Sequence, residues 1–142
     1  MYNESLHSGY LISDNPQKLD LEVIHGYLRR SYWAENVARE IVERSVQNSL
    51  CLGIYAPQGE QVGFVRLITD YATFAWVCDV FVLEEHRGRG LSKAAIQAAL
   101  AHPQLQTLRR FALATRDAHG LYQQFGFTPL AHPENHMERR RS

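Results

Sequence analysis

The spacing of hydrophobic positions along the 142-residue chain predicts an alternation of strands and helices. Runs rich in β-branched and aromatic residues predict strands, whereas apolar residues that recur every three or four positions predict helices. The expected strands cover residues 6–13, 49–56, 61–69, 74–83, 109–115 and 127–130, and a final strand over 137–141 is left open. The expected helices cover residues 19–30, 37–48, 91–101 and 117–125, with Asn36 as the N-cap of the second.

The order of these elements predicts the architecture. Most strands follow one another through short turns, as antiparallel strands do, and the helix over 91–101 then crosses to the strand at 109–115. This order predicts an α/β domain in which a mixed sheet carries helices on its faces. The chain shows no internal repeat and no linker, so residues 1–142 are expected to form a single domain.

Composition narrows the classes of function. The chain carries 15 Lys and Arg residues against 15 Asp and Glu residues, and this balance argues against a general nucleic-acid or membrane-surface binder. No apolar run is long enough to cross a bilayer, and the first residues do not resemble a signal peptide. Cys51 and Cys78 lie in strand-like runs and are interpreted as buried free thiols, which favours a cytoplasmic protein.

The segment from Asp79 to Ser92 carries the clearest chemistry. A predicted strand enters a loop with two glycines, Gly88 and Gly90, and the loop opens a helix. The first turn of a helix offers unpaired backbone N–H groups, and glycines let a ligand approach the backbone closely. Arg87 and Arg89 add positive charge, so a pyrophosphate would fit. Taken alone, the R-G-R-G run would be better explained as a solvated turn, and the P-loop pattern G-x-x-x-x-G-K is absent.

Two motifs in this order resemble a known family. Arg87-x-x-Gly90-x-Ser92 is similar to the R/Q-x-x-G-x-G/A motif of GNAT acetyltransferases, with serine in the last position. Downstream, L-Y-x-x-F-G-F over residues 121–127 resembles the family's last helix and the strand after it. The resemblance implies the GNAT acyl-CoA N-acyltransferase fold, with a mixed, mostly antiparallel sheet of six or seven strands flanked by about four helices.

The resemblance also implies an activity. We expect an N-acetyltransferase that moves acetyl from acetyl-CoA directly to a primary amine, on a small molecule or a protein, without a metal. The bulged strand and the phosphate loop of the family imply these contacts with acetyl-CoA: Val80, Phe81, Val82, Arg87, Gly88, Arg89, Gly90, Leu91, Ser92 and Asp117. Two alternatives stay open: a non-catalytic acyl-CoA-binding module, and an interaction domain that binds no coenzyme.

Two residues are candidates for catalysis. Tyr122 stands where the family places its general acid; the alternative is a tyrosine that only packs against the sheet. Asp79 interrupts an apolar run and is the first candidate for the base, although a structural ion pair with a residue such as Arg66 is equally compatible with the sequence. Weaker candidates for the base are Asp70, Glu84 and His119.

The acceptor side is less defined. Tyr32, Trp33 and Tyr71 are expected to line the acceptor pocket, because the resemblance places their segments over that site. Exposed aromatics at Tyr32 and Trp33 would also suit a homodimer. His132 and His136 lie in a proline-containing loop without cysteine partners, so no metal is expected there.

Overall fold

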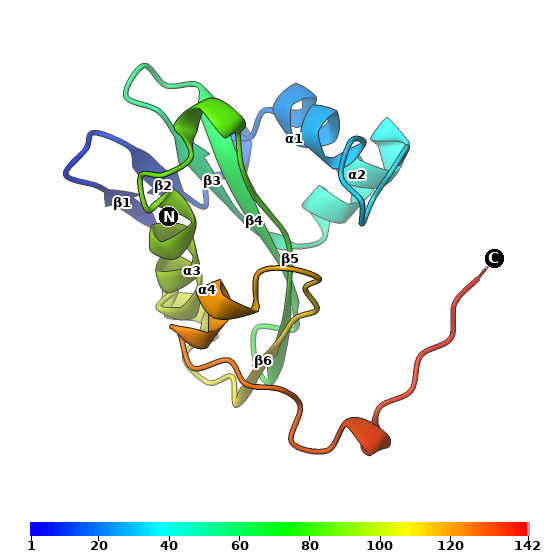
Figure 1. The fold of residues 1–142 in the computed structure, drawn as a ribbon. Helices are drawn as coiled ribbons and strands as arrows, with labels where there is room; N and C mark the ends of the chain where they lie inside the picture. Colours follow the sequence, from blue (N-terminus) through cyan, green and yellow to red (C-terminus); the bar gives the residue numbers. More distant parts are fainter. Residues whose placement is uncertain (142) are drawn as a thin grey trace.

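A computed structural model describes residues 1–141 and contains one six-stranded sheet (Figure 1). The strands are β1 (Asn3–Ser5), β2 (Leu11–Ser13), β3 (Leu50–Tyr55), β4 (Gln61–Thr69), β5 (Phe74–Val82) and β6 (Arg110–Ala112). They lie side by side in sequence order, and every neighbouring pair is antiparallel except β5 and β6, which are parallel. The predicted mixed, mostly antiparallel sheet is therefore confirmed.

The helices cover both faces of this sheet. They are α1 (Leu21–Leu28), α2 (Arg39–Gln47), α3 (Leu91–Leu100) and α4 (His119–Gln123). Figure 1 shows α1 and α2 on one side and α3 with α4 on the other. Short 3-10 turns also occur at Pro16–Lys18, Glu84–His86, Pro103–Leu105 and Pro133–Asn135.

Two apolar cores hold the layers together. Ala95, Ala98 and Ala99 of α3 are buried against the larger core of β-strand side chains, and their small size lets this helix lie close to the sheet. On the other face, Ile24 of α1 and Val42 of α2 pack into a second core with aromatic side chains of β4 and β5. Each fully buried side chain of this size contributes about 1.5–3 kcal/mol.

The ends of the sheet differ from the sequence prediction. Residues 6–13 do not form one strand: the chain reverses between β1 and β2, where Leu6 N–H donates to the carbonyl of Tyr10. Residues 127–130 and 137–141 form no strand. Pro129 explains part of this result, since a proline has no N–H for a ladder bond. The sheet still has six strands, because the N-terminal segment forms the two strands of a hairpin, β1 and β2, where one strand was expected.

The start of α2 also differs from the prediction. Asn36 is not the N-cap, because its φ of 60° lies in the left-handed region and the helix begins only at Arg39. Ala38 occupies the cap position and supplies no side-chain hydrogen bond.

Candidate active site

The centre of β5 carries a bulge. Phe64 pairs with Phe81 and Arg66 pairs with Cys78, so the one residue between them on β4 faces two residues of β5, Asp79 and Val80. Asp79 has a φ of 52°, a conformation that aspartate tolerates better than most residues. The irregularity predicted near residues 80–82 is present and begins at Asp79.

Next to the bulge, β5 separates from β6. The parallel pairing ends at Trp76 and Ala112, although β5 continues to Val82. Residues 77–82 therefore have no strand partner on that side, and the backbone groups facing it are free of ladder bonds. An extended ligand can pair with a strand edge of this kind.

The loop between β5 and α3 ends at a helix N-terminus open to ligands. Gly88 and Gly90 have φ values of 80° and 75°, and a side chain added at either would meet no atom within 4 Å. Gly90 is the N-cap of α3 and provides no side-chain hydrogen bond to the first turn. The N–H groups of this turn, which includes Leu91 and Ser92, are thus available to an anion, and the helix dipole favours negative charge there.

The two arginines of this loop have different surroundings. Arg87 donates from Nε to the carbonyl of Val82, at 2.9 Å, and from a guanidinium nitrogen to the hydroxyl of Tyr27, at 3.0 Å. It thereby ties the loop to β5 and α1. Arg89 is exposed. Tyr27 was not among the sequence candidates, yet it also stacks on Phe81 with ring centroids 4.1 Å apart.

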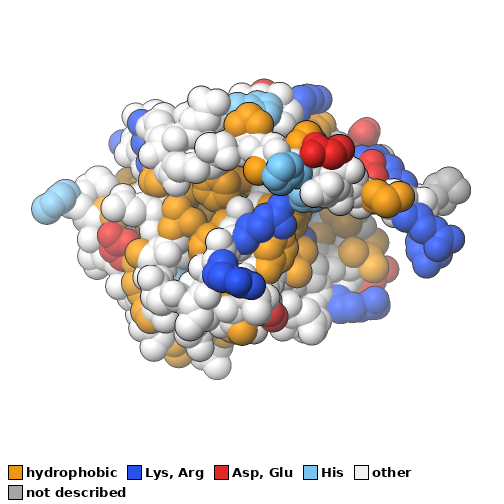
Figure 2. Space-filling model, turned by 90° about the horizontal axis from the view of Figure 1, so that it is seen from below, with side chains coloured by type: hydrophobic (Ala, Val, Ile, Leu, Met, Phe, Trp, Pro, Cys, Tyr) orange, Lys and Arg blue, Asp and Glu red, His pale blue; other side chains and the backbone are white. Residues whose placement is uncertain are grey.

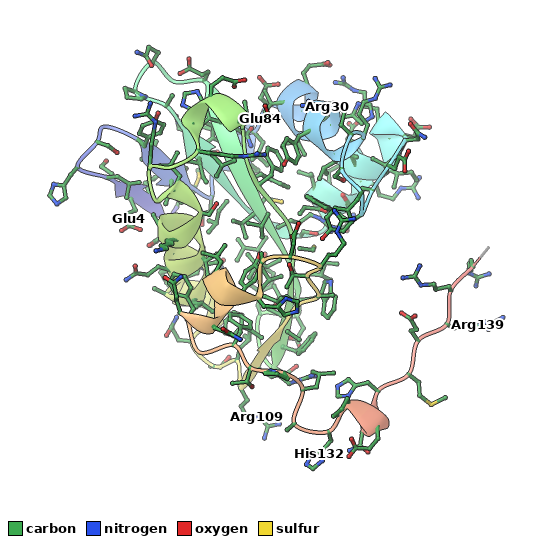
Figure 3. The ribbon with its side chains drawn as sticks, in the orientation of Figure 1. Glu4, Arg30, Glu84, Arg109, His132 and Arg139 are labelled. Carbon is green, nitrogen blue, oxygen red and sulfur yellow. The ribbon has the colours of Figure 1, made fainter. Side chains whose placement is uncertain are left out.

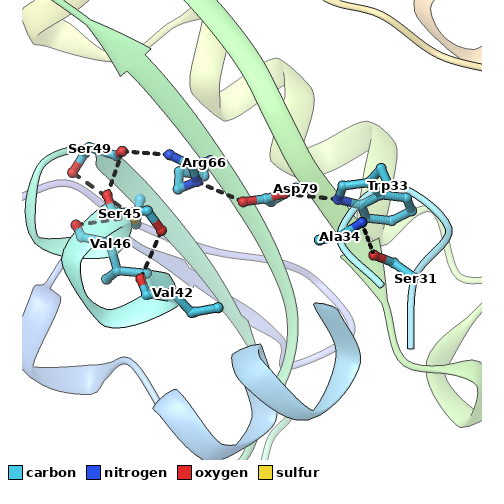
Figure 4. Close-up of polar contacts among 10 residues, drawn as sticks. Ser31, Trp33, Ala34, Val42, Ser45, Val46, Ser49, Arg66 and Asp79 are labelled. Carbon is cyan, nitrogen blue, oxygen red and sulfur yellow. Dashed lines mark hydrogen bonds and ion pairs between the residues drawn. The ribbon is translucent and has the colours of Figure 1, made fainter. Parts of the chain in front are cut away.

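Asp79 lies at the centre of a polar chain (Figure 4). Its Oδ2 accepts a hydrogen bond from Arg66 Nε at 2.7 Å, and its Oδ1 accepts one from the indole N–H of Trp33 at 2.9 Å. Arg66 also donates to the hydroxyl of Ser49, which follows α2. Burial lowers the pKa of Arg66, but the adjacent carboxylate outweighs burial and the net pKa is raised. The ion pair with Arg66 that the sequence left open is present, and it links β4, the bulge and the loop after α1.

Tyr122 lies in α4 and is almost completely buried. Burial, together with the nearby Tyr32, raises the pKa of its hydroxyl to about 12. The ring packs edge-on against Phe127. The hydroxyl is protonated at neutral pH, and the raised pKa keeps it protonated into the alkaline range.

Tyr122 borders a cavity of about 800 Å³. Its walls are residues 110–115 of β6 and the segment after it, α4, and part of the chain from 125 to 136. Seen from below, the molecule exposes hydrophobic side chains in a hollow that Lys, Arg and His side chains flank (Figure 2). The volume is in the range of a small-molecule site.

The three aromatics predicted for the acceptor pocket do not come together. Tyr32 and Trp33 pack edge-to-face with ring centroids 5.1 Å apart. The guanidinium carbon of Arg116 lies over the Tyr32 ring, 3.7 Å from its centroid. Arg116 N–H also donates to the Tyr32 hydroxyl, so the loop after α1 is joined to the segment before α4. Tyr71 lies apart in the β4–β5 turn, and within residues 1–141 it contacts neither aromatic through a ring pair or a hydrogen bond.

Of the remaining sequence candidates, His119, His132 and His136 line the cavity beside Tyr122. Asp117 is exposed, and Glu84 lies at the opposite end of the molecule from His132 (Figure 3). His136 interacts with Arg110, and His132 with Glu134. Within residues 1–141, no group of three or more His, Cys, Asp or Glu side chains has the arrangement of a metal site. No helix in the same range is long and apolar enough to cross a membrane.

Comparison with known proteins identifies the family. The sequence profile described as "Acetyltransferase (GNAT) family" matches residues 21–127. A candidate acetyltransferase from Gibberella zeae is 30% identical over an aligned length of 135 residues. The match covers 80% of this chain and 75% of the relative.

Solved structures show the same fold. A candidate GNAT-family acetyltransferase from Xanthomonas campestris is 49% identical, covers 96% of this chain and 95% of its own, and has a TM-score of 0.90. The NAA60 protein of Arabidopsis thaliana, in complex with a bisubstrate analogue, is 19% identical with a TM-score of 0.67, covering 85% of this chain and 84% of its own, and shows the fold alone. The chain belongs to the GNAT acetyltransferase family and is an acyltransferase.

Proposed function

We propose that this chain transfers the acetyl group of acetyl-CoA directly to a primary amine. One observation carries the proposal: the bulged, unpaired edge of β5 is followed, after one short loop, by the uncapped N-terminus of α3. This combination provides an extended groove for the pantetheine arm and an anion site for the pyrophosphate at its end. The family uses acetyl-CoA as its co-substrate, which supports the choice of donor.

The donor is held by backbone groups. The pyrophosphate binds the first-turn N–H groups at Gly90, Leu91 and Ser92, with Arg89 close enough in sequence to add charge. The pantetheine arm pairs with the free edge at residues 80–82, and one unpaired N–H at the bulge donates to the thioester carbonyl. An oriented donor of this kind contributes about 3 kcal/mol to stabilising the developing oxyanion.

The transfer needs two proton movements. The amine nitrogen attacks the thioester carbon, the C–S bond breaks, and coenzyme A leaves as a thiolate that takes a proton. Tyr122 supplies a hydrogen bond or proton to that sulfur, since its raised pKa keeps it protonated. Asp79 is the candidate acceptor of the amine proton through Oδ1, because this oxygen is held only by the neutral indole of Trp33.

Calorimetric titration with acetyl-CoA tests the donor site. We expect Gly90→Glu to abolish binding, because it places a carboxylate where the pyrophosphate binds. Gly59→Glu is the matched control: Gly59 also has a positive φ, 102°, with open space around it, but lies in the β3–β4 turn. The same charge is thus introduced at another positive-φ position, away from the loop.

The outcome separates the remaining functions. Absence of acetyl-CoA binding by folded wild-type protein would overturn the proposal. Binding with no acetylation of any amine would favour the non-catalytic acyl-CoA-binding module instead.

A further inference from the structure

Two large apolar side chains are exposed side by side on the face of the sheet that carries Arg66. Ile68 is 46% exposed and Trp76 is 37% exposed, and they are direct partners across β4 and β5. Directly opposed residues have Cβ atoms about 5 Å apart, so the two side chains present one continuous surface. Phe74, two residues before Trp76, lies half-buried on the same face. We call Ile68, Phe74 and Trp76 the apolar shelf.

The shelf continues from the bulge. Trp76 precedes Asp79 by three residues on β5, which corresponds to about 10 Å along a strand. Cys78 lies between them, opposite Arg66. The helices α1 and α2 pack on this face through a core that includes Cys51, Phe64 and Phe81 but not the shelf. A molecule that reaches the bulge along β5 from the side of Trp76 therefore passes over the shelf.

Charge limits what the shelf can accept. Both oxygens of Asp79 accept hydrogen bonds from Arg66 and Trp33. The carboxylate of Asp70 accepts hydrogen bonds from the Thr73 hydroxyl and from backbone N–H groups of its own turn. These hydrogen bonds hold its pKa well below the usual range. At the far end, the guanidinium of Arg110 lies 5.3 Å from the ring centroid of Phe74. Arg66 is neutralised by Asp79, whereas Arg110 places a positive charge beside Phe74, so a second ammonium group is disfavoured at that end of the shelf.

We propose that the acceptor is a primary monoamine with an aromatic or long aliphatic body, which lies on Ile68 and Trp76 while its amine reaches the bulge. This inference rests on the proposed function, because it names the substrate class of the same site. Polyamines are disfavoured, because Arg110 borders the shelf at Phe74 and the carboxylate of Asp70 is already hydrogen-bonded within its own turn.

Acetylation rates of four amines test this inference. We expect wild-type kcat/KM to be about 10-fold or more higher for phenethylamine and hexylamine than for ethanolamine and spermidine. Trp76→Thr and Ile68→Thr, which keep strand propensity, should remove most of that preference. Acetyl-CoA binding by calorimetry should be unchanged in both variants. Ile41→Thr is the matched control, since Ile41 is 47% exposed on α2, away from the shelf, and should leave the preference intact.

Three results would overturn the inference. The first is acetyl-CoA binding and amine acetylation without a preference for apolar amines, which leaves the proposed function standing. The second is an equal loss of the preference for apolar amines in Ile41→Thr and Ile68→Thr. The third is a wild-type dimer in light scattering that Trp76→Thr converts to a monomer, because a second copy would then cover the shelf. Failure to bind acetyl-CoA is a different outcome, because it would overturn the proposed function on which the inference rests.

Discussion

Among single residues, the buried hydroxyl of Tyr122 leads to the most direct test of the chemistry. We expect Tyr122→Phe to lower kcat by about 100-fold while leaving acetyl-CoA binding unchanged, because the lost group acts on the leaving sulfur. Steady-state kinetics and calorimetry measure the two quantities. The pKa of about 12 means that the hydroxyl stays protonated below about pH 10, so any alkaline fall in wild-type rate there arises elsewhere. An unchanged kcat would reduce Tyr122 to a packing residue.

Asp79 invites a different comparison, because its carboxylate both faces the bulge and anchors the loop after α1. If it accepts the amine proton, Asp79→Asn should lower kcat about 100-fold. Trp33→Phe, which removes only the indole donor, should retain kcat within a few-fold. If both variants instead raise KM for the amine and leave kcat unchanged, Asp79 is a positioning residue.

Sequence reasoning located the residues of local motifs better than those joined through space. Gly88, Gly90 and Tyr122 occupy the predicted loop and helix, since a strand–loop–helix motif is continuous in the chain. Tyr27 and Arg116 were missed, because each acquires its role from a partner more than 50 residues away, Arg87 and Tyr32. Tyr71 was predicted to line the acceptor pocket only from the family resemblance. The sequence around it does not show in which direction the β4–β5 turn points.

At the level of elements, α1 and α2 differ in how they begin. Asp20 accepts hydrogen bonds from the N–H groups of Glu22 and Val23, whereas Ala38 leaves the first turn of α2 without a side-chain cap. Asp20→Ala should lower the free energy of unfolding by about 1 kcal/mol, and Ala38→Ser should raise it by a similar amount. Urea unfolding measures both. A decrease with Ala38→Ser would show that the extended backbone at this position does not suit a cap.

The long elements were predictable and the short ones were not. β4, β5 and α3 have nine or ten residues with clear periodicity, and the structure places them close to the expected ranges. β1 and β2 have three residues each, too few to show alternation. The expected strand at 127–130 failed because strand propensity at Phe127 does not compensate for Pro129, which interrupts a ladder.

At the level of the whole molecule, Asp14 ties the N-terminal hairpin to the end of α3. It accepts hydrogen bonds from Tyr2 N–H and from Nε2 of the buried His102, each at 2.8 Å. Asp14→Ala should cost about 2 kcal/mol, because the buried His102 donor is left without a partner. Glu4→Ala, on exposed β1, should cost less than about 0.5 kcal/mol in the same urea titration. Equal effects would show that the hairpin is held by other contacts.

The sequential order of the strands has a consequence for synthesis of the chain on the ribosome. β2 to β5 each pair with the strand before them, so all their ladders can close once residue 82 has emerged. The β1–β2, β3–β4 and β4–β5 pairings join strands across short turns, so they lose little loop entropy and form early, whereas β3 reaches β2 only after α1 and α2. Only β6 must wait for a crossover through α3. We therefore expect the edge of β5 that would hold the coenzyme to be present in the nascent chain before Tyr122 has been translated.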